Sequence, residues 1–303
     1  MYVLKTLTNA ALCSIMDLIH MKGEVLLMKK TYGEVLCHID EHATLYRLQR
    51  DIYKLDTPPV TSLFFVRGDG AWYIIDAGED LPTSRARIAA VMEHLGIAPD
   101  QVKAILLTHD HWDHTDGLPH LLALCPEAAI YGAAEENKRA GSRYKRIDDG
   151  DEIGGIFCAV RLYGHAPDML AYLDMRTRSL FSGDGIQLYG VAWAGMFIFE
   201  GIGIYLDSMR RLLTMDIDCI FSSHAYVPLG AFAMGADAVR EYLETAIRCV
   251  EELTRFTLEM YDGGERDADA IKTAFIEKGK ALYPDFPTDG FVDAIRGILR
   301  EYR

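Results

Sequence analysis

The sequence predicts an α/β fold with a helical C-terminal region. Short apolar runs typical of strands alternate with helical segments up to about residue 225, and from Ala236 onward the pattern is helical. The composition agrees with this, because 50% of the 303 residues are hydrophobic and 25% are charged, which is typical of a globular chain with an apolar core.

Strand signals dominate the chain from Tyr32 to Asp76. Thr61–Val66 and Ala71–Asp76 are β-rich runs, and the turn residues Arg67-Gly-Asp-Gly70 between them predict a hairpin. Thr83 or Ser84 then caps a helix that Gly96 ends. The elements expected next are a strand at Val102–Leu107, a helix at Leu118–Leu124 and a strand at Ala129–Tyr131.

Short strands are also expected in the second half of the chain, followed by helices. The strand patterns are Phe157–Leu162, Met169–Leu173, Ser179–Ser182 and Cys219–Ser222, with a helix at Tyr205–Met215. The C-terminal helices are expected in three pieces, interrupted at Gly263-Gly264 and Pro284–Pro287. We therefore divide the chain into an N-terminal extension of uncertain structure (1–30), a catalytic domain (31–235) and a helical region that packs on the same domain (236–303).

The balance of charges is strongly acidic. With 31 Lys and Arg against 45 Asp and Glu, the net charge is −14, and a chain that repels polyphosphate is not expected to bind long nucleic acid. No apolar run approaches the ~18 to 20 residues that span a bilayer, so no membrane association is expected. The first twenty residues lack a signal-peptide pattern and the six cysteines form no CxxC pair, which predicts a cytoplasmic protein with reduced thiols.

A group of metal-ligand residue types follows the strand expected at Val102–Leu107. Four such side chains occur within six residues: His109, His111, Asp113 and His114. In an extended loop, His109 and His111 point to the same side and can share one ion. After a turn, Asp113 and His114 can reach a second ion. Imidazole and carboxylate ligands suit zinc, with iron and manganese as competitors.

Three further residues of the same types follow predicted strands downstream. They are His165, Asp184 and His224, each directly after an apolar run. In α/β folds, binding sites lie at the ends of strands, so these residues are expected to complete two coordination spheres.

These motifs together resemble the metallo-β-lactamase superfamily, in particular its binuclear hydrolases of the glyoxalase II and lactonase kind. The matching features are H-x-H-x-D-H at 109–114, Gly164-His165, Ser182-Gly-Asp184, Ser223-His224 and the upstream Asp76-Ala-Gly78, which cover about residues 60–228. The chain departs from the family after its third ligand, where it has Ala166-Pro-Asp-Met169, and after Asp-His, where it has Thr115-Asp-Gly117. Those departures leave its subgroup open.

The resemblance implies a four-layer αββα sandwich with a binuclear metal site between two sheets. One ion would be held by His109, His111 and His165, and the other by Asp113, His114 and His224. Asp184 would bridge the two ions, and Asp76 would orient a ligand without binding metal.

Such a centre predicts hydrolysis. Two divalent ions lower the pKa of a shared water to give a bridging hydroxide, and they polarise a carbonyl or phosphoryl oxygen. Asp113, beside that water, is the candidate catalytic residue for proton transfer. We therefore predict a metal-dependent hydrolase, with two zinc ions, that cleaves a small ester, lactone or thioester.

Two alternatives use the same fold. A phosphodiesterase or nuclease would need a basic groove, which the net charge of −14 disfavours, although the basic residues between Lys138 and Arg146 could select an anion. A di-iron redox protein of this fold usually has Glu at the position of His111 and an appended flavin domain, and this sequence has neither.

Selectivity is expected to come from residues around the metals. The apolar segment Gly190–Tyr205 is a candidate pocket wall, lid or homodimer contact. The aromatic residues proposed for the pocket are Trp193, Phe197, Phe199, Tyr242 and Phe256, and Tyr189 or Tyr205 are candidate donors to the oxyanion. His94 and His120 are expected to be surface residues.

Overall fold

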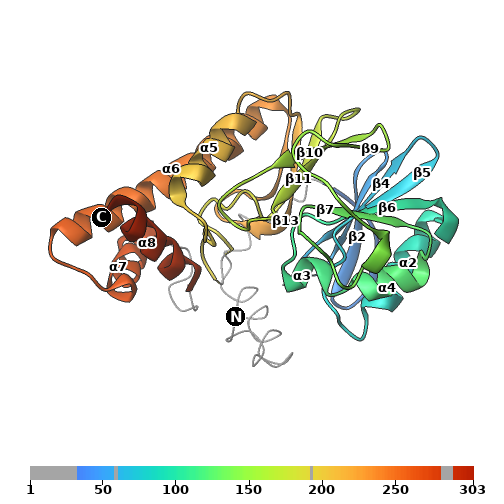
Figure 1. Ribbon diagram of the computed structural model, residues 1–303, viewed down its shortest axis with the longest axis horizontal. Coiled ribbons are helices and arrows are strands. Elements are labelled where there is room, and N and C mark those ends of the chain that lie inside the picture. The colour runs from blue at the N-terminus through green and yellow to red at the C-terminus, as the bar shows by residue number, and fades with distance from the viewer. Residues whose placement is uncertain (1–32, 58–60, 192–193, 281–288) are drawn as a thin grey trace.

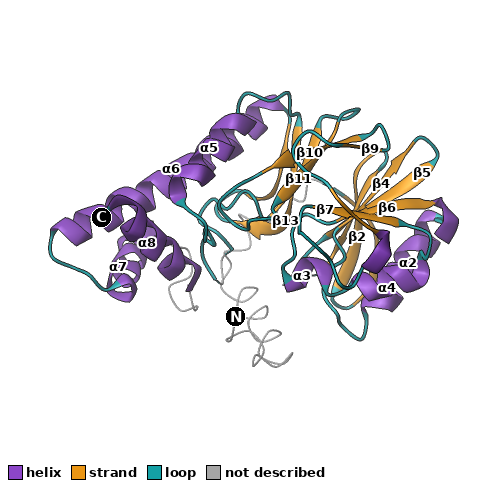
Figure 2. Cartoon of the chain, viewed as in Figure 1, coloured by secondary structure: helices purple, strands orange, loops and turns teal. Residues whose placement is uncertain are grey.

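Two β-sheets form the centre of the computed structural model, with helices on both outer faces (Figures 1 and 2). The structure describes residues 33–57, 61–191, 194–280 and 289–303. The N-terminal extension predicted at 1–30, Trp193 and the interruption predicted at Pro284–Pro287 lie outside the described residues.

The first sheet has eight strands within the described residues, in sequential order. They are β1 (Glu34–Asp40), β2 (Ala43–Gln49), β3 (Ile52–Asp56), β4 (Leu63–Gly68), β5 (Ala71–Ile75), β6 (Val102–Leu106), β7 (Ala129–Gly132) and β8 (Tyr144–Arg146). Neighbours from β1 to β5 pair antiparallel, and those from β5 to β8 pair parallel. The predicted hairpin joins β4 and β5, where Asp69 and Gly70 both take the positive φ angles (51° and 76°) that a tight Asp-Gly turn requires.

The second sheet has six described strands in the order β14-β13-β12-β11-β10-β9. They are β9 (Glu152–Ile153), β10 (Phe157–Arg161), β11 (Leu170–Asp174), β12 (Ser179–Gly183), β13 (Cys219–Tyr226) and β14 (Gly230–Met234). Only β12 and β13 pair parallel among these. Strand β14 is not among the predicted strands, because its small residues give no strand pattern. It forms by pairing with β13.

The helices lie on opposite sides of the two sheets (Figure 1). Along the chain, the helices between the strands of the first sheet are α2 (Ser84–Leu95), η3 (Pro99–Gln101), α3 (Trp112–Thr115), α4 (Leu118–Leu124) and η4 (Gly141–Arg143). The helices after the second sheet's strands are α5 (Ile202–Leu212), α6 (Ala236–Asp262), α7 (Ala268–Phe275), η5 (Ile276–Lys280) and α8 (Asp289–Tyr302). Helix α6 packs against β13 and β14, and α7 and α8 pack against α6 (Figure 1). As predicted, Gly96 ends α2, in a left-handed conformation with φ 65°. At the start of α2, Thr83 makes no capping hydrogen bond through its side chain.

Helix α5 begins three residues before the predicted start at Tyr205. The carboxylate of Glu301 on α8 accepts hydrogen bonds from the backbone N–H groups of Ile202 and Gly203, at 2.8 and 2.9 Å. These donors at the start of a helix have no partner within the helix itself. A residue 98 positions away therefore stabilises the additional turn, which a local sequence pattern does not show.

Three buried apolar clusters fill the spaces between four layers. Between the sheets, Phe64 and Phe157 contact Phe181, and Phe221 contacts both Phe64 and Phe181, with ring centroids 5.2 to 6.3 Å apart. A second cluster joins the first sheet to α2 and α4, and a third joins the second sheet to α5–α8. This confirms the predicted αββα sandwich with C-terminal helices.

Candidate metal centre

All seven predicted metal ligands lie at one edge of the two sheets. His109 follows β6, His165 follows β10 and Asp184 follows β12. His111, Asp113 and His114 lie at the start of α3 or within it, and His224 lies in β13. Backbone hydrogen bonds join the sheets at this edge, from Leu170 to Thr108 (2.8 Å) and from Ser62 to Ser223 (3.1 Å). His109, His165, Asp184 and His224 are thus held in or close after strands, where the two sheets are hydrogen-bonded to each other.

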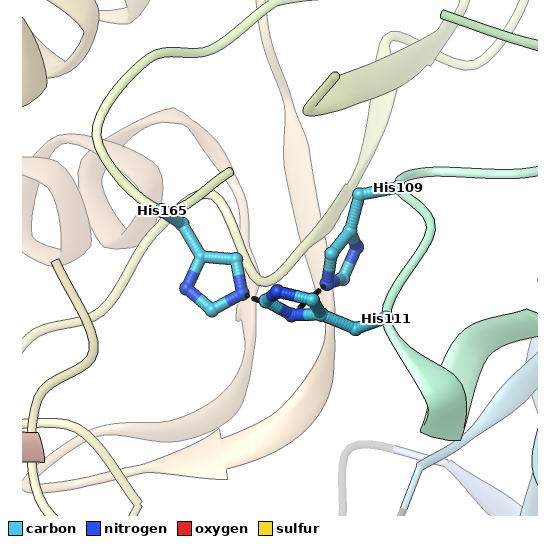
Figure 3. A group of neighbouring side chains, drawn as sticks. All are labelled: His109, His111 and His165. Atoms are coloured by element: carbon cyan, nitrogen blue, oxygen red, sulfur yellow. Dashed lines mark hydrogen bonds between the residues drawn. The ribbon is translucent and has the colours of Figure 1, made fainter. Parts of the chain in front are cut away.

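The first group of donors consists of three histidines (Figure 3). Nδ1 of His111 lies 2.9 Å from Nε2 of His109 and 3.0 Å from Nε2 of His165. Two ligands of a tetrahedral zinc ion, each ~2.0–2.1 Å from the metal, are ~3.3 Å apart. The three nitrogens therefore converge to nearly the spacing that one ion requires.

The second group consists of Asp113, His114 and His224. Oδ2 of Asp113 lies 3.2 Å from Nε2 of His224 and 3.6 Å from Nε2 of His114. These distances are again those of neighbouring ligands on one ion.

Asp184 lies between the two groups. Its Oδ1 is 3.4 Å from Nε2 of both His114 and His224, and its Oδ2 is 3.6 Å from Nε2 of His165. Oδ1 is buried and makes no hydrogen bond to the residues that the structure describes. A buried, unsatisfied carboxylate oxygen is unfavourable in a protein interior, and a cation would satisfy it. The donor set and this oxygen therefore fit a site for metal ions.

The histidines of the first group are poised as neutral ligands. Burial and the neighbouring imidazoles hold the pKa of His109 well below its usual value. Burial also lowers the pKa of His111, and it lowers that of His165 to about 4. At neutral pH these imidazoles keep the lone pairs that a metal ion needs.

In the second group, the charges of the carboxylates and imidazoles determine the direction of the pKa shifts. Burial alone would lower the pKa of His224, but Asp184 and Asp113 raise it to about 10. Burial would likewise raise the pKa of Asp113, but the imidazoles of His114 and His224 hold it well below its usual range. Without metal, protons on the histidines supply the positive charge here, and a divalent cation supplies the same charge in their place.

Asp76, for which the sequence predicts the role of orienting a ligand, is hydrogen-bonded to His114. Its Oδ2 accepts a hydrogen bond from Nδ1 of His114 at 2.8 Å, and its Oδ1 accepts from the backbone N–H of Thr108 at 2.8 Å. Asp76 has φ 62°, a left-handed conformation unfavourable for a non-glycine residue. The hydrogen bond through Nδ1 leaves Nε2 of His114 facing the site.

Two buried polar residues at the centre, Gln187 and Thr61, carry no signal in the sequence. Gln187 donates to the backbone carbonyl of Asp184 (2.7 Å) and accepts from the backbone N–H of Phe197 (3.0 Å). The carbonyl of Phe197 in turn accepts from Nδ1 of His165 (2.8 Å). The hydroxyl of Thr61 lies in the second group of donors. Neither residue type nor spacing marked these residues, because ordinary polar side chains occur throughout the chain.

Only some of the aromatic residues predicted for the pocket lie at the site. Phe199 is 41% exposed, and its ring centroid lies 5.7 Å from that of His165 and 5.7 Å from that of Phe197. The prediction was wrong for Tyr242 and Phe256, which are buried in the apolar cluster between the second sheet and α5–α8. Their positions on α6 turn them toward this core because the helix is amphipathic.

The two tyrosines proposed as oxyanion donors make other hydrogen bonds. The hydroxyl of Tyr189 donates to Glu252, and that of Tyr205, which is fully buried, accepts from the backbone N–H of Gln187 at 2.9 Å.

Three of the five basic residues from Lys138 to Arg146 are paired with acids. Arg139 bonds to Asp116, Arg146 lies 3.0 Å from Glu135, and Lys138 lies 3.7 Å from Glu136. Part of the positive charge of this segment is thus compensated locally, which weakens the case for an anion-binding groove.

A sequence profile of the metallo-beta-lactamase superfamily matches residues 56–224, which is more than half of the chain and contains all seven candidate ligands. The chain belongs to the metallo-beta-lactamase superfamily. The match begins at the end of β3 and ends at His224, so the segment shared with the superfamily contains both donor groups.

Individual superfamily members share about a third of the aligned residues. The atrochrysone carboxyl ACP thioesterase of Emericella nidulans is 31% identical over 142 residues, covering 46% of this chain and 43% of that protein. The hydroxyacylglutathione hydrolase of Hamiltonella defensa is 31% identical over 158 residues, covering 50% and 57%. The chain spans about half the length of these curated relatives. Both are hydrolases by name.

A solved member of the superfamily has the same fold over most of the chain. The metallo-beta-lactamase family protein TTHA1429 of Thermus thermophilus superposes with a TM-score of 0.63 at 20% identity, covering 84% of this chain and 94% of that protein.

In the described part of this chain, no helix is both long and apolar enough to cross a membrane.

Proposed function

We propose that the chain is a binuclear metal-dependent hydrolase that cleaves a small ester, lactone or thioester. The observation that carries the proposal is the position of Asp184, whose two carboxylate oxygens face two separate groups of donor atoms. One carboxylate shared in this way is the arrangement expected for a pair of cations, because its charge offsets their repulsion. Zinc is the proposed metal, since imidazole nitrogen and carboxylate oxygen are among its usual ligands.

The residues of the centre have distinct proposed roles. His109, His111 and His165 would hold one ion, and Asp113, His114 and His224 the other, with Asp184 between them. Bound divalent ions would supply Lewis-acid chemistry, lowering the pKa of a water molecule and polarising the acyl oxygen of the substrate. Asp113, in the second group of donors, is the proposed acceptor of the proton from the attacking water.

The names of the relatives support an acyl substrate. One is a thioesterase and another hydrolyses a hydroxyacylglutathione. We therefore place a thioester first among the three proposed bonds, with a free small molecule as the partner of this site.

The exposed ring of Phe199 supports an apolar acyl group. The ring lies against His165, and its centroid is 6.4 Å from that of His111, so a substrate at the metal ions would contact it. Its backbone is held in place, because the N–H groups of Phe199 and Glu200 both donate to the carbonyl of Gly164, at 2.8 and 3.0 Å. A preorganised apolar surface stabilises a bound apolar group by ~25 cal/mol per Å² buried.

The test is a comparison of kcat/KM on zinc-loaded protein across acetyl and hexanoyl thioesters, matching aryl esters, a lactone and an aryl phosphodiester. We expect acyl substrates to exceed the phosphodiester by at least about tenfold, since kcat/KM reports transition-state preference. A tenfold preference for the phosphodiester, abolished by neutralising Arg143 and Arg146, would instead establish a phosphodiesterase.

A matched pair of variants tests the acyl surface. Phe199→Met and Phe199→Gln have side chains of similar length that differ in polarity. The Met variant should keep the hexanoyl-over-acetyl preference of the native protein, and the Gln variant should reduce it several-fold. Met175→Ala, at an exposed apolar residue in the turn before β12, is the control and should leave the preference unchanged.

A further inference from the structure

The hydroxyl of Thr61 lies within the second group of metal-ligand atoms. Its Oγ1 is 3.1 Å from Oδ2 of Asp113, 3.1 Å from Nε2 of His224 and 3.4 Å from Nε2 of His114. The residue is 1% exposed. This buried hydroxyl is therefore within hydrogen-bonding distance of all three candidate ligands of the second group.

The backbone around Thr61 is held by contacts outside this group. The N–H of Ser62 donates to the carbonyl of Ser223 at 3.1 Å, next to His224, and the hydroxyl of Ser62 donates to Asp56 at 3.1 Å. The carbonyl of Thr61 accepts from the hydroxyl of Thr57 at 2.7 Å. The backbone of Thr61 is therefore held by its neighbours before β4 and by β13 of the second sheet, through hydrogen bonds that do not involve the Thr61 hydroxyl.

The single hydroxyl proton of Thr61 has one suitable acceptor when metal is bound. Nε2 of His114 and Nε2 of His224 then direct their lone pairs at the cation and neither donate nor accept hydrogen bonds. Oδ2 of Asp113 keeps a free lone pair, since a carboxylate oxygen has two. Among the residues that the structure describes, Thr61 is the hydroxyl that donates to this oxygen.

We propose that Thr61 is a positioning residue of the metal centre: its hydroxyl donates to Oδ2 of Asp113 and fixes the orientation of that carboxylate beside His114 and His224. The inference rests on the metal centre of the proposed function. Asp113 is partly buried on a helix of only four residues, so its own element restrains it weakly, and the hydrogen bond from Thr61 in the segment before β4 supplies the restraint. Hydrogen bonds of this kind to ligands typically change metal affinity 10- to 100-fold.

The test uses the full-length chain with Thr61→Val, which removes the hydroxyl and keeps the shape, and Thr61→Ser, which keeps the hydroxyl. Zinc affinity and stoichiometry are measured by titration against a chromophoric chelator. We expect the Val variant to bind the weaker of two zinc ions about 10- to 100-fold less tightly, and the Ser variant to stay within about threefold of the native protein. Thr61→Ala also removes the hydroxyl, in a smaller side chain, and should weaken zinc binding as much as Thr61→Val does. It replaces Thr61→Val in the test if that variant does not fold.

The control is Thr257→Val on α6. Thr257 is equally buried, and its hydroxyl has no hydrogen-bond partner among the described residues. This variant should bind zinc as the native protein does. Native affinity in both hydroxyl-free variants, or equal weakening in Val and Ser, would overturn the role of Thr61. Failure of the native chain itself to bind zinc would overturn the proposed function instead.

Discussion

Replacing Glu79 by glutamine should stabilise the metal-free protein at pH 8 and much less at pH 5. Glu79 lines a small recess of about 20 Å³ together with apolar side chains such as Leu55, Leu63 and Ile88. Its Oε1 is buried and has no hydrogen-bond partner among the described residues. Burial, and then the charge of Asp113, raise the pKa of Glu79 from 4.5 to about 7.

The sign and size of the effect follow from this pKa. A folded protein that holds a proton more tightly than the unfolded chain loses stability as the pH rises through the interval between the two values, here about 4.5 to 7. A pKa difference of this size corresponds to about 3 kcal/mol in the free energy of unfolding at pH 8, and to under about 1 kcal/mol at pH 5. Glutamine carries no charge, so Glu79→Gln avoids this loss, and its advantage should grow by about 2 kcal/mol from pH 5 to pH 8.

The assay is urea unfolding of chelator-treated native and variant protein at several pH values. Metal is removed because bound cations would attract the Glu79 charge and reduce the effect. Glu93→Gln, at an exposed position on α2, is the control and should show no such pH-dependent gain. A stability difference between Glu79→Gln and native protein that does not change with pH would refute the reasoning.

Three other outcomes are expected. Asp184→Ala should lose at least one metal ion and nearly all hydrolytic activity, because the carboxylate of Asp184 faces both donor groups. Full metal content by elemental analysis, together with normal turnover, would contradict the bridging role. Chelation of the native protein should lower the melting temperature as well as the activity, since ions bound only to the folded state stabilise it, and an unchanged Tm would argue against a bound metal. The net charge of −14 predicts weak binding to a generic oligonucleotide at physiological salt, and tight, salt-sensitive binding in a mobility-shift assay would contradict this.

Local patterns predicted the elements that are stabilised locally. The helix at Leu118–Leu124 and the hairpin at Asp69-Gly70 were expected where they occur, because helical spacing and turn chemistry involve neighbours in the chain. The start of α5 and the edge strand β14 were not, since Glu301 and β13 stabilise them from elsewhere in the fold. Tertiary contacts override local propensity at such places.

The sequence by itself determined the superfamily and the seven candidate ligands. Metal coordination accepts few residue types, so histidines and aspartates placed directly after apolar strands are a specific signal. Only the tertiary structure decided which oxygens of Asp184 face which histidines, and which neutral or acidic groups surround them. Thr61 lies 52 residues from Asp113 in sequence, and any polar residue can fill a hydrogen-bonding position once packing brings it there. Hydrogen-bond partners therefore depend on the packing of the two sheets, whereas the ligands themselves depend on the chemistry of the metal.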